Sequence, residues 1–368
     1  MMLSKISNDL LTKEGPLTVI LQTTSACNLN CIYCYCDHGK SKPLVIKDFE
    51  NIVIKLDESF NSNMDICLLF HGGEPLLLGI EFYQQAFSFL RKFERHFYTG
   101  IQTNLTLLDE PFAELFLENK CSISTSMDGI LSVHDINRKF SNGLGSFHCV
   151  REKMDLLNKM NIGFGIVTVL NNENIKSPRD FHTFINDNLN RRINFSPMFL
   201  PNQNGSNSVN IKKLGCFLIL LYDIWVEDSS HSKLSFFEDI IANFLGGNLS
   251  PLCTFQESCG QDFITISSDG DVYLCSHFVG QKKYCYGNIL ISTFSEIWDS
   301  KTRIKMLERE KDSRARCRGC DFFEICFSGC MANTIESIYE KDYFCEAYKM
   351  LFRHIKKSLN YQLNLLTK

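Results

Sequence analysis

Hydrophobic and polar positions change their period repeatedly along the first 200 residues. Short β-branched, apolar runs alternate with longer amphipathic stretches, which is the pattern of strands alternating with helices. The runs predicted as strands are Leu17–Gln22, Ile66–Phe70, Tyr98–Gln102, Ser122–Ser126, Phe164–Val169 and Ile193–Met198. The stretches predicted as helices cover residues 47–60, 80–96, 109–119, 145–160 and 178–187.

Six strand–helix units in series predict an α/β fold with a parallel sheet and right-handed crossovers. Six units suit a partial (β/α)6 barrel better than a closed barrel of eight, and ligands then bind at the carboxyl ends of the strands. The second predicted helix carries an aromatic stripe that we interpret as core packing. Its members are Phe82, Ala86, Phe89, Leu90, Phe93 and Phe97.

The second part of the chain has a different residue pattern. Two helices are predicted at 211–228 and 234–245, and cysteines then become dense from Cys253 while helical periodicity weakens until about residue 333. The segment Tyr343–Leu365 is predicted as a closing helix. We therefore expect two domains, 1–235 and 236–368, with the boundary near residue 235.

Composition excludes several classes of protein. The 368 residues are 44% hydrophobic and 22% charged, so the chain can bury a core, and its net charge of −4 gives no sign of nucleic-acid binding. The longest apolar run, Leu214–Leu221, is too short to span a bilayer. The N-terminus lacks the apolar stretch of a signal peptide. We expect a cytoplasmic protein with neither membrane nor nucleic acid as partner.

Cysteine is the unusual component. Seventeen cysteines are far above ordinary usage, and an odd number cannot pair completely within one chain. In a chain of this size without an export signal, such cysteines indicate metal binding rather than disulfides.

Three of the cysteines follow the first predicted strand in the pattern C-x3-C-x2-C. Three thiolates on one short loop can hold three irons of a cubane cluster and leave the fourth iron open, whereas zinc usually requires four protein ligands. These residues are Cys27, Cys31 and Cys34, in the run CNLNCIYC. The second strand ends in Gly72-Gly73-Glu74-Pro75, where two glycines allow a ligand to approach the backbone closely.

The combination of CNLNCIYC and GGEP resembles the radical SAM (S-adenosylmethionine) superfamily, and the resemblance extends over essentially the whole chain. It implies a 4Fe–4S cluster on the three cysteines, with SAM bound to the open iron. The residues implied in SAM binding are Tyr33, Gly72, Gly73, Glu74, Ser124, Ser126, Asp128 and Arg138. Gln102 and Asn104, at the end of the third strand, are expected to face the same cavity as catalytic candidates. The alternatives are a surface or helix-capping Arg138 and an ordinary strand-end turn at 102–104.

The resemblance also implies a reaction. One electron from the cluster cleaves SAM, and a 5′-deoxyadenosyl radical takes a hydrogen atom from the substrate. The protein must exclude water and hold the target C–H bond in place.

Eight further cysteines lie in the last third of the chain. Eight thiolates can ligate two cubane clusters completely, and two structural zinc sites are the alternative. The pattern resembles the SPASM domain of radical SAM peptide-modifying enzymes. The resemblance implies Cys253, Cys259, Cys275 and Cys330 around auxiliary cluster I, and Cys317, Cys320, Cys326 and Cys345 around auxiliary cluster II. Spacing alone does not select this partition. Electron transfer from a substrate radical is the implied role.

The substrate is the least determined feature. The length and motifs of the chain resemble those of anaerobic sulfatase-maturating enzymes and of maturases of ribosomally made peptides. Both groups act on a peptide or protein side chain. In sulfatase-maturating enzymes, an aspartate directly after the third cysteine of auxiliary cluster I acts as a base. Here Ser276 and His277 follow Cys275 instead. His277 is the candidate base, with a structural histidine as the alternative.

We therefore predict an oxidative peptide maturase that forms a side-chain cross-link, carbon–carbon (cyclophane-like) or thioether. The alternatives are a sulfatase-maturating enzyme that oxidises Ser or Cys to formylglycine, and a non-enzymatic iron–sulfur carrier. Only 26 residues precede Cys27, which leaves no room there for the winged-helix recognition domain of many peptide maturases. We therefore expect any leader segment of the peptide to bind elsewhere, or a separate protein to bring it. The expected redox partner is a reductant of the flavodoxin or ferredoxin type.

Overall fold

A computed structural model describes residues 16–36, 41–61, 64–188, 191–200, 208–228, 234–246, 253–256 and 259–366. The chain divides into two compact units, each built from three separate segments. The first unit contains residues 1–126, 138–164 and 258–308, and the second contains 127–137, 165–257 and 309–368. None of the described helices is long and apolar enough to cross a membrane.

Strands and helices alternate in the first unit as the hydrophobic pattern predicts. In chain order they are β1 (Leu17–Thr24), α2 (Ile46–Ser59), β2 (Ile66–Gly72), η1 (Pro75–Leu78), α3 (Ile80–Leu90), β3 (Phe97–Thr103), α4 (Glu110–Glu118), β4 (Ser122–Ser126) and α6 (Phe147–Lys159). Later segments add α10 (Cys259–Asp262), β7 (Phe263–Ile266), β8 (Asp271–Tyr273), η5 (Ser276–Phe278), η6 (Lys282–Tyr284), β9 (Gly287–Asn288) and α11 (Phe294–Trp298). The helix α12 (Lys301–Arg316) begins in this unit and ends in the second.

The sheet of the first unit is parallel at its centre. Its strand order is β4-β3-β2-β1-β7-β8-β9, and β1 pairs in parallel with both β2 and β7. The strands β8 and β9 join in antiparallel fashion. Because β1 to β4 all run in one direction, their carboxyl ends share one edge of the sheet, and this edge carries the loop with Cys27, Cys31 and Cys34.

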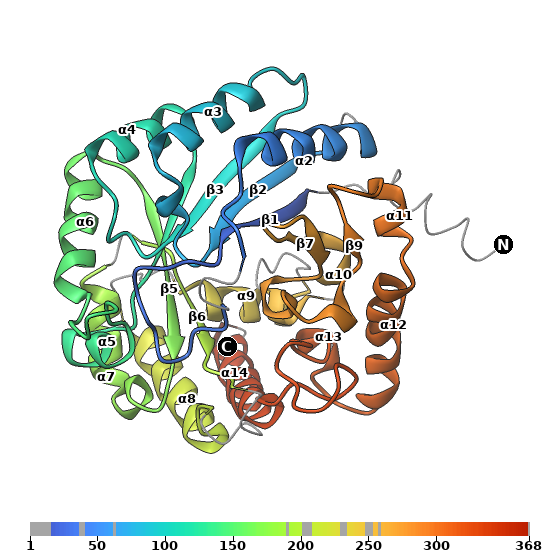
Figure 1. Ribbon diagram of the computed structural model, residues 1–368. Helices are drawn as coiled ribbons and strands as arrows, with labels where there is room; N and C mark the ends of the chain where they lie inside the picture. Colours follow the sequence, from blue (N-terminus) through green and yellow to red (C-terminus); the bar gives the residue numbers. More distant parts are fainter. Residues whose placement is uncertain are drawn as a thin grey trace. The chain divides into compact units, whose positions relative to one another are not determined.

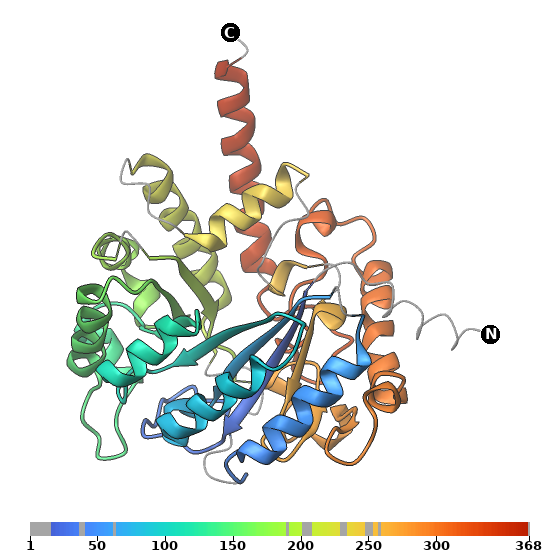
Figure 2. The ribbon, with the colours of Figure 1, turned by 90° about the horizontal axis from the view of Figure 1, so that it is seen from above.

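Aromatic side chains form much of the core between this sheet and its helices. The helices α2 and α3 lie along one face of strands β1 to β3 (Figures 1 and 2). Tyr83 is fully buried among Phe70, Phe87 and Phe116, and its hydroxyl donates to the carbonyl of Pro75 (2.7 Å). This bond satisfies the buried hydroxyl and attaches α3 to the segment directly after Glu74.

The helix α3 is shorter than predicted. It ends at Leu90, whereas the aromatic stripe predicted a helix to residue 96, and Phe97 begins β3 instead. Arg95 accounts for the early end. Its buried guanidinium donates to Asp57 and to carbonyls at the end of α2, which holds the chain out of helical register.

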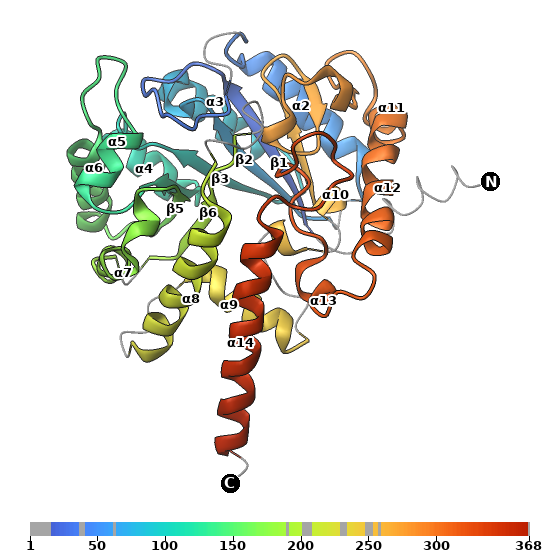
Figure 3. The same cartoon turned by 90° about the horizontal axis from the view of Figure 1, so that it is seen from below.

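The second unit combines two parallel strands with packed helices. Its elements are α5 (Leu131–Asn137), β5 (Phe164–Leu170), η2 (Asn174–Lys176), α7 (Pro178–Asn186), β6 (Ile193–Pro197), α8 (Ile211–Glu227), α9 (Ser235–Phe244), η4 (Cys253–Phe255), α13 (Phe323–Cys326) and α14 (Cys345–Leu366). The helices α8 and α14 lie side by side (Figure 3). Their contact is close because Gly215 leaves room for Met350, whose sulfur would lie 2.7 Å from a Cβ at that glycine.

Candidate functional site

The cysteines of the C-x3-C-x2-C motif lie together on the loop that follows β1. Cys27, Cys31 and Cys34 are all half-buried. The N–H of Leu29 donates to Cys27 Sγ (3.4 Å), and the N–H of Cys34 donates to the carbonyl of Cys31 (3.1 Å). Burial raises the pKa of Cys27 to about 12. A thiolate at this position therefore requires a nearby cation, such as cluster iron, to stabilise it.

Two glycines at the end of β2 pack against the backbone just before Cys27. The N–H of Gly73 donates to the carbonyl of Thr24 (2.7 Å). A Cβ at Gly73 would lie 2.1 Å from the carbonyl oxygen of Ala26, and Gly72 has a left-handed φ of +129°. Any side chain at Gly73 therefore displaces the end of β1 or the cysteine loop that follows it.

Glu74 is completely buried, and its carboxylate is surrounded by donors from the protein itself. Oε1 accepts from the N–H of Leu76 (3.0 Å) and the hydroxyl of Thr103 (2.6 Å), and Oε2 accepts from the N–H of Asn104 (2.7 Å). Burial raises its pKa to about 7, although these three hydrogen bonds act in the opposite direction. The carboxylate thus joins the ends of β2 and β3, and its contact with SAM stays a prediction.

Asn104 connects β3 to the cysteine loop. Its Nδ2 donates to Asn28 Oδ1 (2.9 Å) and contacts Cys27 Sγ (3.7 Å). Its Oδ1 accepts from the N–H and the hydroxyl of Thr106. The sequence identified Asn104 as a catalytic candidate, but these bonds give it a direct role in positioning the first cysteine of the motif.

The other predicted residues of the first unit fall into two groups. Gln102 Nε2 donates to Ser126 Oγ (3.0 Å), and Ser124 lies opposite Gln102 in the β3–β4 register. Arg138 is 7% exposed, and its guanidinium carbon lies 5.3 Å from the centre of the Tyr33 ring. This cation–π contact connects Arg138 to the cysteine loop, which an ordinary helix cap does not require.

Asp128 belongs to the second unit and is fully buried there. Its Oδ1 accepts from the N–H of Val169 (3.1 Å), and its carbonyl accepts from Asn174 Nδ2 (3.3 Å). These bonds attach the segment after β4 to β5. The predicted contact of Asp128 with the ribose stays a prediction.

His277 stacks on an aromatic residue of the cysteine loop. Its ring centre lies 4.4 Å from that of Tyr35, with 29° between the planes. Burial, and to a smaller extent the nearby His277, lowers the pKa of His71 to about 4. The structure therefore brings the predicted base to the loop of Cys34, and its role as a base stays a prediction.

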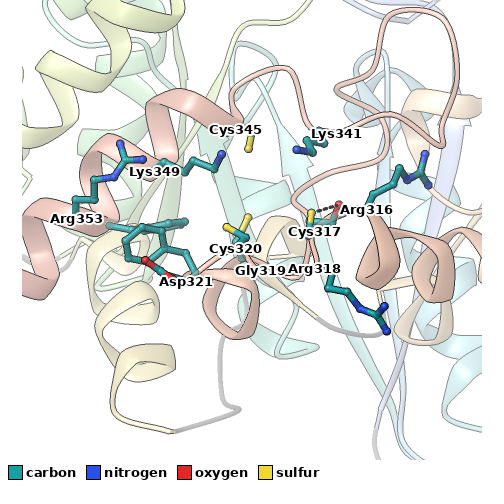
Figure 4. A pocket seen from close by; sticks show the side chains of 14 residues that line it. Arg316, Cys317, Arg318, Gly319, Cys320, Asp321, Lys341, Cys345, Lys349 and Arg353 are labelled. Atoms are coloured by element: carbon teal, nitrogen blue, oxygen red, sulfur yellow. Dashed lines mark hydrogen bonds between the residues drawn. The ribbon is translucent and has the colours of Figure 1, made fainter.

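Four cysteines of the last segment line one cavity of about 320 Å³ in the second unit. They are the four that the resemblance assigns to auxiliary cluster II: Cys317, Cys320, Cys326 and Cys345. Figure 4 labels Cys317, Cys320 and Cys345. Cys317 Sγ lies 3.6 Å from Ser328 Oγ. The structure thus brings together four thiols that are up to 28 positions apart in the sequence.

The other four cysteines divide between the two units. Cys253 and Cys330 belong to the second unit, where both influence the hydroxyl of Tyr348 electrostatically. Cys259 and Cys275 belong to the first unit, and Cys275 has the same kind of influence on Tyr35. Their grouping around auxiliary cluster I stays a prediction.

Asp342 is a positioning residue that sequence reasoning missed. It is 2% exposed, and its carboxylate accepts from the N–H groups of Cys330 (2.8 Å) and Phe344 (2.7 Å) and from Asn333 Nδ2 (3.2 Å). One side chain therefore fixes a predicted ligand of auxiliary cluster I and the start of α14, where Cys345 stands. An acidic residue three positions before a cysteine is the only trace of this role in the sequence.

Family models match two parts of the chain, which include the C-x3-C-x2-C motif and five of the eight later cysteines. The model of the radical SAM superfamily matches residues 21–185, and the SPASM model, an iron–sulfur cluster-binding domain, matches residues 253–321. The chain belongs to the radical SAM superfamily. It is a radical SAM enzyme with a SPASM domain, as predicted, and it uses SAM and 4Fe–4S clusters.

Similar proteins match more than nine-tenths of the length of this radical SAM enzyme. A "Serine-type anaerobic sulfatase-maturating enzyme" of Bacteroides thetaiotaomicron is 30% identical over 94% of this chain and 91% of the relative. A "Cysteine-type anaerobic sulfatase-maturating enzyme" of Clostridium novyi is 29% identical over 93% and 96%. By this similarity the chain belongs to the same family as these enzymes.

Solved structures agree with this placement. The structure titled "Native anSMEcpe with bound AdoMet and Kp18Cys peptide" matches with a TM-score of 0.86 and 27% identity, over 95% of this chain and 99% of that one. Streptococcus suis SuiB bound to precursor peptide SuiA matches with a TM-score of 0.67 at 14% identity, over 93% and 78%, which shows the fold alone. The predicted fold class is confirmed. The domain boundary near residue 235 and the cytoplasmic location stay predictions.

The residues present fit the cofactors of this family. Three thiols on one loop are the donor set of a cluster with an open iron, and four thiols around one cavity are the donor set of a fully ligated cluster. When bound, SAM and its cluster supply a carbon radical able to take a hydrogen atom from a substrate. The chain itself positions the cysteines through Gly73, Asn104 and Asp342.

Proposed function

We propose that this radical SAM enzyme oxidises a cysteine or serine side chain of a peptide or protein to the aldehyde of formylglycine. The observation that supports the proposal best is the similarity to anaerobic sulfatase-maturating enzymes over more than nine-tenths of both chains. Formylglycine formation, which the sequence analysis gave as an alternative, therefore has more support than the cross-linking reaction that we placed first.

The reaction removes two hydrogens from the substrate side chain. One leaves as a hydrogen atom, and the second leaves as a proton while one electron passes to an auxiliary cluster. A serine yields the aldehyde directly, whereas a cysteine yields a thioaldehyde that exchanges sulfur for oxygen with water. The chain must therefore provide an acceptor for the proton and a path for the electron.

His277 is the proposed acceptor of the proton. The resemblance implies an aspartate directly after Cys275, but Ser276 occupies that position and is 7% exposed. His277 is the next residue and lies against Tyr35 on the cysteine loop. His277→Gln keeps a polar side chain of similar length and removes the base, so we expect it to slow aldehyde formation while SAM cleavage continues.

The proposal is tested on the product. The chain is expressed anaerobically with a sulfatase-derived peptide carrying cysteine at the target position, and with the same peptide carrying serine. We expect hydrazide labelling of one or both peptides, and loss of two hydrogens from the serine peptide. An unchanged mass and no hydrazide labelling in either peptide would contradict the proposal.

Ser276 also favours a second candidate, a side-chain cross-link. A reaction that forms no aldehyde has no need for the missing aspartate, and a cross-link also removes two hydrogens. A short peptide encoded beside the gene is therefore tested in parallel. Loss of two hydrogens without hydrazide labelling supports the cross-link, and epimerisation without net oxidation contradicts both candidates. The family assignment gives no support to a non-enzymatic iron–sulfur carrier.

A further inference from the structure

The four-cysteine cavity of the second unit is surrounded by cationic side chains. Five of them line it, together with Asp321: Arg316, Arg318, Lys341, Lys349 and Arg353. Five cations and one carboxylate give the described lining a formal charge of +4, whereas the whole chain carries −4. The cations are thus concentrated at this cavity against the overall charge.

The cationic side chains differ in whether they point toward the cysteine sulfurs or away from them. Figure 4 shows the amino groups of Lys341 and Lys349 pointing toward Cys345, whereas Arg316 and Arg318 extend away from the sulfurs. Lys349 is half-buried and ion-paired with Glu346 (2.9 Å). A fully thiolate-ligated cubane cluster is an anion, so the two lysines that point inward compensate charge inside the cavity. The two arginines that point outward have no such task.

Arg316 and Arg318 are exposed and stand on both sides of Cys317. The guanidinium carbon of Arg316 lies 5.6 Å from the centre of the Tyr339 ring, which restricts its side chain. Arg353, on α14, is exposed on another wall of the same cavity. Three exposed guanidinium groups around one mouth create a positive field that attracts an anionic protein surface and raises its association rate.

We propose that Arg316, Arg318 and Arg353 form the docking surface for a small acidic one-electron carrier protein that exchanges an electron with the cluster in this cavity. In the exchange the reduced cluster loses one electron and the oxidised carrier gains it, and no bond or proton moves. The inference rests on the proposed oxidation, because each turnover leaves one electron to be removed from the auxiliary clusters.

Guanidinium groups suit this role for two reasons. Each presents several donors to the carboxylates of a partner and stays charged at every relevant pH. Exposed charges are screened within about 10 Å at 0.1 M salt, so attraction that depends on them weakens as salt rises. Salt dependence therefore distinguishes this surface from an apolar contact.

The test measures association of the reconstituted holoenzyme with an acidic bacterial ferredoxin by anaerobic stopped flow, at low and at high ionic strength. We expect the double variant R316E/R318E to lower the association rate at low ionic strength by about tenfold or more. R316Q/R318Q should give a smaller loss. At high ionic strength the wild-type rate should fall toward that of the variants.

Arg179→Glu is the control. Arg179 is exposed near the start of α7, also in the second unit, and its replacement changes net charge in the same direction as each arginine of the pair. We expect its association rate to stay near that of the wild type. Iron content and the auxiliary-cluster EPR signal check that each variant retains its clusters. If R316E/R318E loses its clusters, the association rate of R316Q/R318Q is compared with that of the wild type instead.

The proposal fails if the double variants associate as fast as the wild type, or if R179E slows association equally. It also fails if their main effect is a raised KM for the peptide with dithionite as reductant, because the surface then binds an acidic peptide segment. In that assay dithionite reduces the SAM cluster directly and no carrier protein is present, so KM reports peptide binding. Failure of the wild type to modify any peptide with dithionite is therefore a failure of the proposed function, and the docking result stands apart from it.

Discussion

Glu74 provides the sharpest prediction about the edge of the sheet that carries the cysteine loop. Replacing it with glutamine keeps the size of the side chain but turns one acceptor oxygen into a donor NH2 group. Three donors converge on the carboxylate, from Leu76, Thr103 and Asn104, so at least one of them loses its acceptor. An unsatisfied buried donor costs about 1–3 kcal/mol of stability.

The size of this loss depends on pH. Burial raises the pKa of Glu74 to about 7 from its ordinary 4.5, so the folded protein holds an extra proton on this group between these values. Unfolding releases that proton, and wild-type stability therefore falls as pH rises through the window. The shift corresponds to about 3 kcal/mol in total, of which about 1 kcal/mol falls between about pH 6 and about pH 8.

The expected result is that Glu74→Gln destabilises the protein by about 1 kcal/mol less at the higher pH than at the lower one, because the variant has no group that titrates there. The assay is anaerobic urea unfolding followed by circular dichroism. Glu114→Gln, on the exposed side of α4, is the control and should show no such trend. A destabilisation that stays constant or grows with pH would refute the reasoning.

Two further predictions concern the clusters. Gly73→Ala should lower bound iron and SAM affinity, measured by iron content and calorimetry, because its Cβ would lie 2.1 Å from the carbonyl oxygen of Ala26; Gly163→Ala, with nothing within 4 Å of its Cβ, should leave both unchanged. Cys31→Ala should abolish 5′-deoxyadenosine formation, while Cys326→Ala should retain part of it, as measured by chromatography of the nucleoside. Equal loss in the two cysteine variants would contradict the division of the cysteines between different clusters.

The regular part of the fold could be predicted from hydrophobic periodicity. All six strands predicted in the first 200 residues lie within a few residues of their predicted bounds, because most are short apolar or β-branched runs between amphipathic helices. The helix α12 was missed because Lys301–Arg316 is polar around almost its whole circumference and buries cations such as Arg303 and Arg309. The short strands β7 to β9 were missed because two to four residues do not establish a period.

The candidate site shows the same limit. The thiols and glycines are recognisable because their spacing is local. The partners that position them are distant in sequence: Asn104 reaches Cys27 across 77 positions. Such contacts depend on the parallel register of β1, β2 and β3, which no local pattern encodes. The charged mouth of the four-cysteine cavity likewise needs α14 to bring Arg353 to the residues around Cys317.

The place of β1 in its sheet affects how the protein is made. Thr18 pairs with Phe263, so one edge of this early strand has no partner until 245 more residues have been synthesised. At about 5–20 residues per second, the ribosome needs about 12–50 s to produce β7. An apolar strand with an open edge is prone to pair with other chains during that time. Expression at a lower temperature, or with a chaperone that shields nascent strands, should therefore raise the yield of soluble enzyme more than a stronger promoter does.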